Sequence, residues 1–364
     1  MHSNHTNDGD EPSHGDDIKS LLASSNSKGV SSWDKKLLWE RIEADIQRKK
    51  KRFFYRKIGI AATLISLLIS GVAIVTTLTT TESGMAEIAQ NISLESFESN
   101  DVQLFLSDTR NVEISSEESN ITYQAGGKIS IDSSEEFEEK NFASGFNTLI
   151  VPYGRKTKLT LEDGTKVWVN SGSKLVYPVS FNNKERKIFV EGEAFFEVTK
   201  DNERPFIVET NDTNLRVLGT SFNVSSYSDD QTISAVLVTG SLMVLVDKSS
   251  KIRKKETLLK PNDRLSFHKA SKKTVVKKVN VSPYISWKDG YLIYNSTSLK
   301  KVFTQLERYY NIEIVLSDPL ISQEKLSGKL DLKQNAEEIL EIICSTSKLK
   351  LDKNERRYII NKSI

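Results

Sequence analysis

The sequence predicts a mainly β protein with a small α+β domain at its C-terminal end and a single membrane-spanning helix. Three observations support this prediction. An uncharged apolar run covers residues 58–78, short alternating segments crowd residues 147–281, and a strand–helix–strand pattern occurs twice in residues 282–364. A hydrocarbon core of about 30 Å needs about 20 helical residues, so the run is long enough to cross it.

Charges beside the apolar run predict its orientation. Seven basic residues precede it: Arg48, Lys49, Lys50, Lys51, Arg52, Arg56 and Lys57. Because Lys and Arg concentrate on the cytoplasmic side of a span, we expect a cytoplasmic N-terminus and C-terminal domains outside. A cleaved signal peptide would have its apolar core close to the start and small residues at a cleavage site. The run lacks both features, which favours a retained anchor.

The N-terminal arm has two parts. Residues 1–32 are rich in Ser, Asn, Asp, Gly and His without apolar periodicity, which predicts a disordered tail. Residues 33–57 predict an amphipathic helix and a basic flank, with an apolar face formed by Trp33, Leu37, Leu38, Trp39, Ile42 and Ile46. So short a helix has no core of its own, so this face needs a protein partner or the membrane surface.

Residues 79–146 differ sharply in charge from their surroundings. Between residues 82 and 145 there are fourteen acidic residues and three basic ones. Such a composition predicts a solvated, loosely ordered linker. The basic residues of the chain gather beside the predicted span, where they fit a role in topology and lipid contact, so nucleic-acid binding is not expected.

Residues 147–281 predict an all-β domain of short strands. Segments 157–162 and 165–170 alternate around Asp163-Gly164, a strong hairpin signal. Further strands are expected at 187–191, 194–199, 206–210, 215–218, 221–226, 234–238 and 241–246. Evenly spaced short strands are typical of a sandwich, a barrel or a solenoid-like domain, and the pattern leaves these open.

Residues 282–364 predict a small α+β domain. A strand at 291–294 precedes a helix that Ser298 is expected to cap and Asn311 to end. After strands at 312–316 and 325–332, Asn335 and Glu338 predict a capping box, and strands at 348–352 and 358–361 follow. The apolar helix faces, including the single cysteine Cys344, are expected to form ordinary core.

The sequence contains no recognisable enzyme motif: no nucleophile elbow, phosphate-binding loop or H-E-x-x-H pair. Glu191 and Glu193 could suggest a carboxylate pair, but a solvated strand face is the favoured interpretation. Three of the four histidines lie in the N-terminal tail, where no fixed geometry supports a metal site. We therefore expect no catalytic, cofactor-binding or metal-binding residues, and binding and signalling rather than turnover.

Six short segments occur in a recognisable order: 151–154, 159–170, 175–178, 190–198, 204–208 and 217–224. Together they resemble the FecR family of bacterial transmembrane sensors and anti-sigma factors. Residues 287–290 and 306–310 resemble the C-terminal domain of the Bacteroidetes-type members, which is similar to the secretin/TonB short N-terminal fold.

The resemblance implies a signalling relay. A TonB-dependent outer-membrane transporter senses its ligand, and its periplasmic signalling domain contacts the outer region of the sensor. The cytoplasmic arm then controls an extracytoplasmic-function sigma factor, here expected through the apolar face that begins at Trp33. This implies an inner-membrane protein with periplasmic C-terminal domains and control of a glycan or siderophore uptake operon. The alternatives are an envelope adaptor without a transcriptional role and, least favoured, an anchored hydrolase.

The resemblance also singles out one peptide bond. Some family members cleave themselves at a Gly-Thr bond that matches Gly219-Thr220. The threonine hydroxyl would attack the Gly219 carbonyl carbon, and water would hydrolyse the resulting ester. A glycine bend before the strand at 221–226 explains the same pair without chemistry, and this second interpretation is favoured.

Overall fold

The computed structural model describes residues 84–91, 99–107, 110–124, 128–132, 135–138, 145–246 and 255–363, together with Glu40, Ala44, Arg48, Ser66 and Ser70. The chain divides into two compact units, Met1–Thr81 and Glu82–Ile364. The predicted tail at 1–32 lies outside the described residues, as does the predicted span apart from Ser66 and Ser70. No helix within the described residues is long and apolar enough to cross a membrane.

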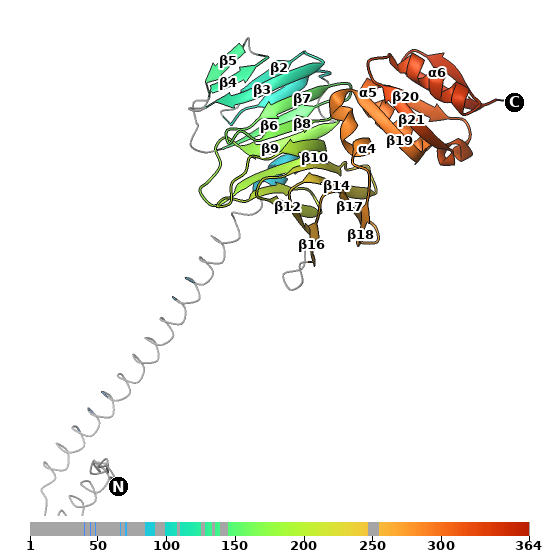
Figure 1. Ribbon diagram of the computed structural model, residues 1–364. Helices are drawn as coiled ribbons and strands as arrows, with labels where there is room; N and C mark the ends of the chain where they lie inside the picture. Colours follow the sequence, from blue (N-terminus) through green and yellow to red (C-terminus); the bar gives the residue numbers. More distant parts are fainter. Residues whose placement is uncertain are drawn as a thin grey trace, which may run out of the picture. The chain divides into compact units, whose positions relative to one another are not determined.

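The Glu82–Ile364 unit is mainly β, as predicted, and its larger part consists of two sheets (Figure 1). Sheet 1 has the order β2-β1-β6-β9-β10-β11-β12-β15-β16. Sheet 2 has the order β5-β4-β3-β7-β8-β10-β13-β14-β17-β18. The strands are β1 (Val102–Phe105), β2 (Asn111–Ile114), β3 (Glu118–Gln124), β4 (Lys128–Ile131), β5 (Glu135–Glu138), β6 (Phe146–Val151), β7 (Lys156–Thr160), β8 (Lys166–Val169), β9 (Ser173–Pro178), β10 (Arg186–Glu197), β11 (Phe206–Glu209), β12 (Thr213–Val217), β13 (Ser221–Ser226), β14 (Thr232–Thr239), β15 (Leu242–Val246), β16 (Lys255–Leu259), β17 (Asp263–His268) and β18 (Lys273–Lys278).

Strand β10 belongs to both sheets. Its first half pairs with β9 and β11, and its second half, from Gly192 onward, pairs with β8 and β13. Gly192 has φ 104°, and a Cβ there would lie within 2.6 Å of the Ser173 backbone. A side chain is therefore excluded at the crossing point. The two strands that the sequence predicted around this glycine are one continuous strand.

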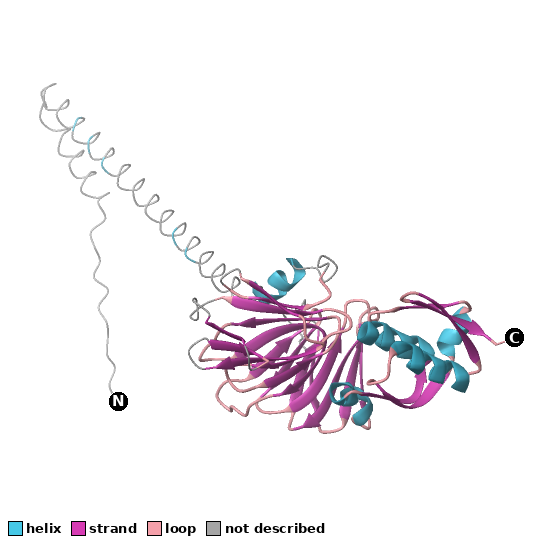
Figure 2. Cartoon of the chain, turned by 90° about the horizontal axis from the view of Figure 1, so that it is seen from above, coloured by secondary structure: helices cyan, strands magenta, loops and turns pink. Residues whose placement is uncertain are grey.

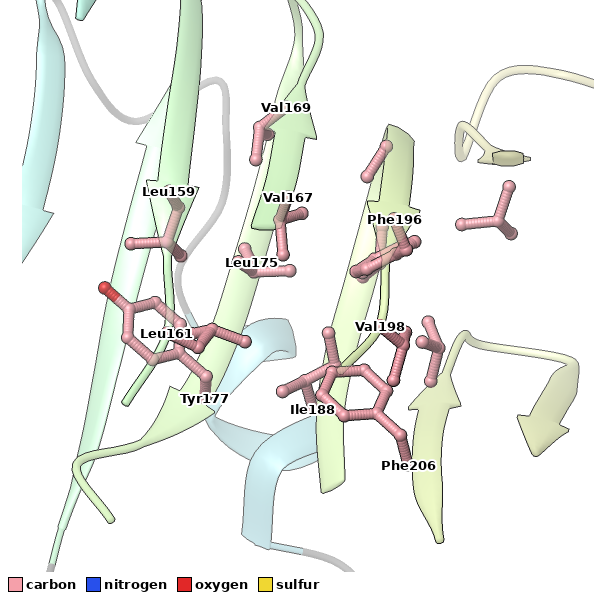
Figure 3. Packing of buried hydrophobic residues seen from close by; sticks show 14 of the residues in the cluster. Leu159, Leu161, Val167, Val169, Leu175, Tyr177, Ile188, Phe196, Val198 and Phe206 are labelled. Atoms are coloured by element: carbon pink, nitrogen blue, oxygen red, sulfur yellow. The ribbon is translucent and has the colours of Figure 1, made fainter. Parts of the chain in front are cut away.

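One hydrophobic core fills the space between the sheets, which makes the domain a sandwich. Strands of sheet 1 contribute Leu175 and Ile188, and strands of sheet 2 contribute Leu159, Val167 and others. Figure 3 shows these side chains converging from neighbouring strands. Full burial of a Val, Leu, Ile or Phe side chain contributes about 1.5–3 kcal/mol, so this core dominates the stability of the domain.

The acidic segment at 79–146 differs from the expectation of a loosely ordered linker. It supplies helix α3 (Gly84–Asn91) and strands β1 to β5, which join both sheets. Val102, Leu104, Ile121 and Ile129 from this segment are fully or almost fully buried. The expectation was wrong because alternation in short strands hides apolar positions within an acidic average.

The predicted hairpin around Asp163-Gly164 is confirmed. Strands β7 and β8 pair antiparallel, and Gly164 has φ 80° between them. The Asp163 carboxylate accepts hydrogen bonds from the Thr165 backbone N–H and hydroxyl, and from Arg186 Nη1 at 2.7 Å. The hairpin is thus fixed to the first residue of β10.

The C-terminal module follows the sandwich. It consists of α4 (Ser282–Ile285), the 3-10 turn η2 (Ser286–Asp289), β19 (Tyr291–Ser298), α5 (Leu299–Tyr310), β20 (Glu313–Leu316), η3 (Pro319–Gln323), β21 (Lys325–Asp331), α6 (Ala336–Thr346), β22 (Leu349–Asn354) and β23 (Arg357–Lys362). Its strands form the pair β19-β21 and the sheet β20-β23-β22. In Figure 2 the longer helices lie against these strands.

Two of the three predicted helix-end signals in this module are confirmed. Asn335 and Glu338 form the expected capping box of α6, and Asn311 ends α5 with φ 53°. Ser298 precedes α5, but its side chain makes no capping hydrogen bond. The N–H of Leu299, the first residue of α5, donates to the carbonyl of Glu324, so a tertiary contact holds the start of the helix. Cys344 is buried in the module core, as expected, and burial raises the pKa of its thiol to about 11.

Candidate functional site

The C-terminal module packs on the outer face of sheet 2. Trp287 of η2 belongs to the same buried cluster as Phe195 of β10, and Trp168 of β8 packs against this cluster. The rings of Trp168 and Phe195 meet edge to face with centroids 5.6 Å apart, and Lys288 Nζ lies 5.4 Å from the Phe195 centroid. We call this contact the junction.

A buried carboxylate lies under the apolar part of the junction. Asn223 Nδ2 donates to Glu193 Oε1 at 3.0 Å, and Asn170 Nδ2 donates to Glu193 Oε2 at 2.9 Å. Asn223 Oδ1 in turn accepts from Trp287 Nε1 at 3.2 Å. A chain of hydrogen bonds therefore connects strands β10 and β13, and the residue directly after β8, to the C-terminal module.

The interpretation of Glu191 and Glu193 as a solvated strand face was wrong. Glu193 has a relative exposure of 8%, and Lys174 pairs with Glu191 at 3.1 Å on sheet 1. Because β10 changes sheets at Gly192, the two carboxylates take part in different contacts. Burial raises the pKa of Glu193, while the two asparagine hydrogen bonds and the charges of Lys301 and Arg308 lower it in part.

Arg308, in the last turn of α5, forms the charged part of the junction. Its Nη2 donates to Asp229 Oδ1 at 2.8 Å and to Asp230 Oδ1 at 2.8 Å, in the turn between β13 and β14. The guanidinium carbon lies 3.6 Å from the Tyr227 ring centroid. Burial alone would lower the pKa of Arg308, but its hydrogen bonds and neighbouring charges raise it, so the residue stays charged. The Arg308 carbonyl also accepts from Gly154 N–H at 2.9 Å.

The junction joins the C-terminal module to the sandwich through apolar packing, hydrogen bonds and ion pairs. Each oxygen of the Glu193 carboxylate accepts a hydrogen bond from an asparagine amide. Arg308 Nη2 is paired with two aspartates, whereas the buried Arg308 Nε has no hydrogen-bond partner within the described residues. Across the described ranges, no group of three or more His, Cys, Asp or Glu side chains has the geometry to hold a metal ion.

The Gly219-Thr220 bond lies in the turn between β12 and β13. Thr220 Oγ1 donates to the Ser241 carbonyl at 3.0 Å, and the Thr220 carbonyl accepts from Val198 N–H at 3.0 Å. A Cβ at Gly219 would lie 2.8 Å from Lys200 Cα, so close packing accounts for the glycine. No acidic or basic side chain is hydrogen-bonded to this hydroxyl in the part of the chain that the structure describes.

The structure does not bring together all residues that the sequence singled out. The expected sigma-factor contacts Trp33, Leu37, Leu38, Trp39, Ile42 and Ile46 lie outside the described residues. The junction was not predicted, although Trp287 and Arg308 stood inside the two C-terminal segments that carried the family resemblance. Two features of the sequence could have indicated it. Arg308 lies in an otherwise apolar helix turn, and Asp229 and Asp230 lie side by side between two strands.

Comparisons with known proteins match both sides of the junction. The family described as FecR protein matches residues 147–243, and the family described as FecR, C-terminal matches residues 291–360. Two crystal structures of an anti-sigma factor from Parabacteroides distasonis, at 1.65 Å and 2.50 Å resolution, are similar to this chain. The first is 31% identical with a TM-score of 0.54, and the match covers 60% of this chain and 99% of that one. The second is 32% identical with the same TM-score, and the match covers 60% and 100%. No curated protein matches.

Proposed function

The chain belongs to the FecR family and is a sigma-factor-regulating sensor, and we propose that it works as an anti-sigma factor in a relay that begins at a TonB-dependent outer-membrane transporter. The observation that carries the proposal is that both family regions meet at the junction. A stimulus received by the C-terminal module would reach the sandwich through buried contacts between packed elements, which resist independent movement.

The proposed topology is a single-pass protein of the inner membrane. The length of the uncharged run at 58–78 supports the span, and the basic residues before it support a cytoplasmic N-terminus. The sandwich and the C-terminal module then lie in the periplasm, where a transporter signalling domain could reach them.

The C-terminal module is the proposed docking site for the transporter. In its sheet β20-β23-β22, strands β20 and β22 each pair on one side within the described residues. Such edges can accept a strand from a partner, and main-chain hydrogen bonds then supply affinity. The controlled genes would serve nutrient uptake, with a glycan or a siderophore as the imported ligand.

The cytoplasmic contact of the proposal is the apolar face of residues 33–57. Trp39 and Ile42 stand at its centre, and in a short helix such a face gains stability only when a partner covers it. An extracytoplasmic-function sigma factor is the partner that the family membership supports.

Capture from the native host tests this contact. Full-length tagged chain is solubilised in detergent, and the proteins that purify with it are identified by mass spectrometry. We expect a sigma factor with the wild type and at least about tenfold less of it with Trp39→Ala plus Ile42→Ala, since two large apolar anchors are lost. The matched control, Lys36→Ala plus Glu43→Ala on the polar face, should keep the capture. Absence of a sigma factor, or equal capture by both double variants, would overturn the proposal.

A further inference from the structure

Strand β18 (Lys273–Lys278) is an open edge of sheet 2. It pairs with β17 through six consecutive residue pairs without a shift of register, and no described strand pairs with its other side. Figure 1 shows it beyond β17, at an end of the sheet. The strand contains no proline and no bulge, which are two common devices that keep another strand from adding to an edge. Its backbone is therefore able to pair with a further strand.

The side chains of β18 alternate between the two faces of sheet 2. Val276 stands opposite the buried Leu265 of β17, so it lies on the core side. Because successive side chains of a strand point to opposite faces, Lys273, Val275 and Lys277 lie on the outer face. Val275 and Val276 are 39% and 42% exposed, so both faces of this edge have uncovered apolar surface. An added strand would cover part of it.

Two basic residues stand side by side on the outer face of this edge. Lys277 of β18 is the cross-strand neighbour of Arg264 of β17. Arg264 Nε donates to the hydroxyl of Ser234 at 3.0 Å, which leaves its charge uncompensated. No acidic side chain within the described residues forms an ion pair with Arg264, Lys273 or Lys277. Because like charges directly opposite each other on neighbouring strands are destabilising, this arrangement would gain from a negative charge beside Lys277.

Two neighbouring lysines of the same region do have acidic partners. Lys272, directly before β18, pairs with Asp212 at 3.1 Å, and Lys278, its last residue, pairs with Asp263 at 3.0 Å. The lysines without an acidic partner are thus the two on the outer face of the edge, four residues apart. Lysines on an edge also disfavour pairing between identical edges, so a second copy of β18 is a poor partner. The charge of the edge fits an acidic strand instead.

We propose that β18 accepts an extended acidic segment of another protein as an additional strand of sheet 2. The segment places one acidic residue opposite Lys273 and another opposite Lys277, with an aliphatic residue between them opposite Val275. Main-chain hydrogen bonds supply affinity, and the alternating side chains supply specificity. The acidic residue beside Lys277 also offsets the repulsion from Arg264. This surface is separate from β20 and β22, the strands proposed to receive the transporter.

Synthetic peptides added to the full-length chain in detergent test the proposal. The probe peptide has the core Glu-Val-Val-Val-Glu. One control replaces both glutamates with lysine, and a second control, Glu-Pro-Val-Pro-Glu, keeps the charge but cannot pair as a strand. By fluorescence anisotropy we expect the probe to bind at least about tenfold more tightly than either control, because it alone combines attractive charge pairs with main-chain hydrogen bonds. Its binding should slow amide hydrogen exchange within β18.

Charge reversal in the chain locates the site. Lys273→Glu plus Lys277→Glu should bind the acidic probe at least about tenfold more weakly and should now prefer the lysine peptide. Lys184→Glu plus Lys200→Glu, the same charge change at exposed positions outside β18, should bind like the wild type. Equal binding of the proline peptide would show a general attraction for anions and would overturn strand addition. A probe that binds no better than the lysine peptide, unchanged exchange in β18, or equal losses in the two double variants would overturn it as well.

Discussion

The two outer faces of the sandwich are covered in different ways. On sheet 1, Met85 and Ala89 of the short helix α3 pack on Val176 and Phe189. On sheet 2, a complete module with its own core covers Trp168 and Phe195 and adds the buried hydrogen bonds of Glu193. The small contact, made by α3, lies nearer in sequence to the predicted span. The large contact is made by the C-terminal module, which is the proposed docking site for the transporter. The difference indicates that α3 detaches from sheet 1 more easily than the C-terminal module detaches from sheet 2.

Strand β10 contacts both α3 and the C-terminal module. Phe189 in its first half packs with α3, and Phe195 in its second half packs with the C-terminal module. Glu191 and Glu193 follow the same division, with Lys174 on one face and the asparagines on the other. A change at the junction can therefore reach the contact of α3 through one strand, which gives the following predictions.

Gly192→Val should disturb the packing of both α3 and the C-terminal module. We expect it to lower the free energy of unfolding more than any other substitution considered below. The valine would need φ near 104° and would overlap Ser173, so we expect a loss of about 3 kcal/mol or more in the free energy of unfolding. Urea unfolding of the full chain measures it. Gly290→Val is the control, because Gly290 has φ 82° but open space around its Cβ position, and should cost about 1–2 kcal/mol. Equal losses would contradict the crowding argument.

Arg308→Ala should loosen the junction alone. It removes the stacking on Tyr227 and the contacts with Asp229 and Asp230, whose carboxylates are 59% and 35% exposed and stay hydrated. We expect a loss of about 2 kcal/mol, seen as faster amide hydrogen exchange in α5 with little change in α3. Arg356→Ala, an exposed residue of the same module, should change the stability by less than about 0.5 kcal/mol. Equally faster hydrogen exchange in α3 and in α5 would show that Arg308 does not stabilise the junction locally.

Met85→Ala should loosen the other cover. Loss of this buried side chain leaves α3 with little apolar contact, and we expect its opening free energy to fall by about 1–2 kcal/mol. Hydrogen exchange should change in α3 and not in α5. Glu87→Ala on the exposed side of the same helix is the matched control. An unchanged α3 would mean that the contact with Phe189 contributes little.

Glu193→Gln should remove a pH dependence that belongs to the junction. Because the pKa of Glu193 in the folded chain is raised above its ordinary value of 4.5, its stabilising contribution is complete below that value. The contribution is lost as the pH rises through the raised pKa. The free energy of unfolding, measured from pH 4.5 upward through the raised pKa, should decline with pH in the wild type. In the Glu193→Gln variant it should depend less on pH. Identical profiles would indicate that another group is responsible.

Thr220→Ala tests the least expected event, cleavage at Gly219-Thr220. The hydroxyl donates to Ser241, so we expect one full-length band for both the wild type and the variant in immunoblots against tags at the two ends. The variant should lose about 1 kcal/mol of stability with the hydrogen bond. Two fragments in the wild type and one band in Thr220→Ala would establish self-cleavage instead.

The sequence predicted the features that depend on local signals. The turn at Asp163-Gly164 and the capping box at Asn335 each follow from the chemistry of a few adjacent residues. The buried state of Glu193 could not be predicted, since its partners are Asn223 of strand β13 and Asn170 at the end of β8, and Trp287, which donates to Asn223, comes from another module. The acidic segment was misjudged for a different reason: its charge was averaged over the whole segment, whereas burial alternates from residue to residue along each strand.

The transcript profile of the native host tests the central claim, that this sensor controls transcription and that the junction carries its signal. We compare the wild type, a deletion strain, and a strain whose full-length chain carries Trp287→Ala plus Arg308→Ala. The account predicts that the deletion changes one transporter operon and that the junction variant alters the same operon while it still captures the sigma factor. A deletion that changes no transporter operon would contradict it and favour an adaptor without a transcriptional role.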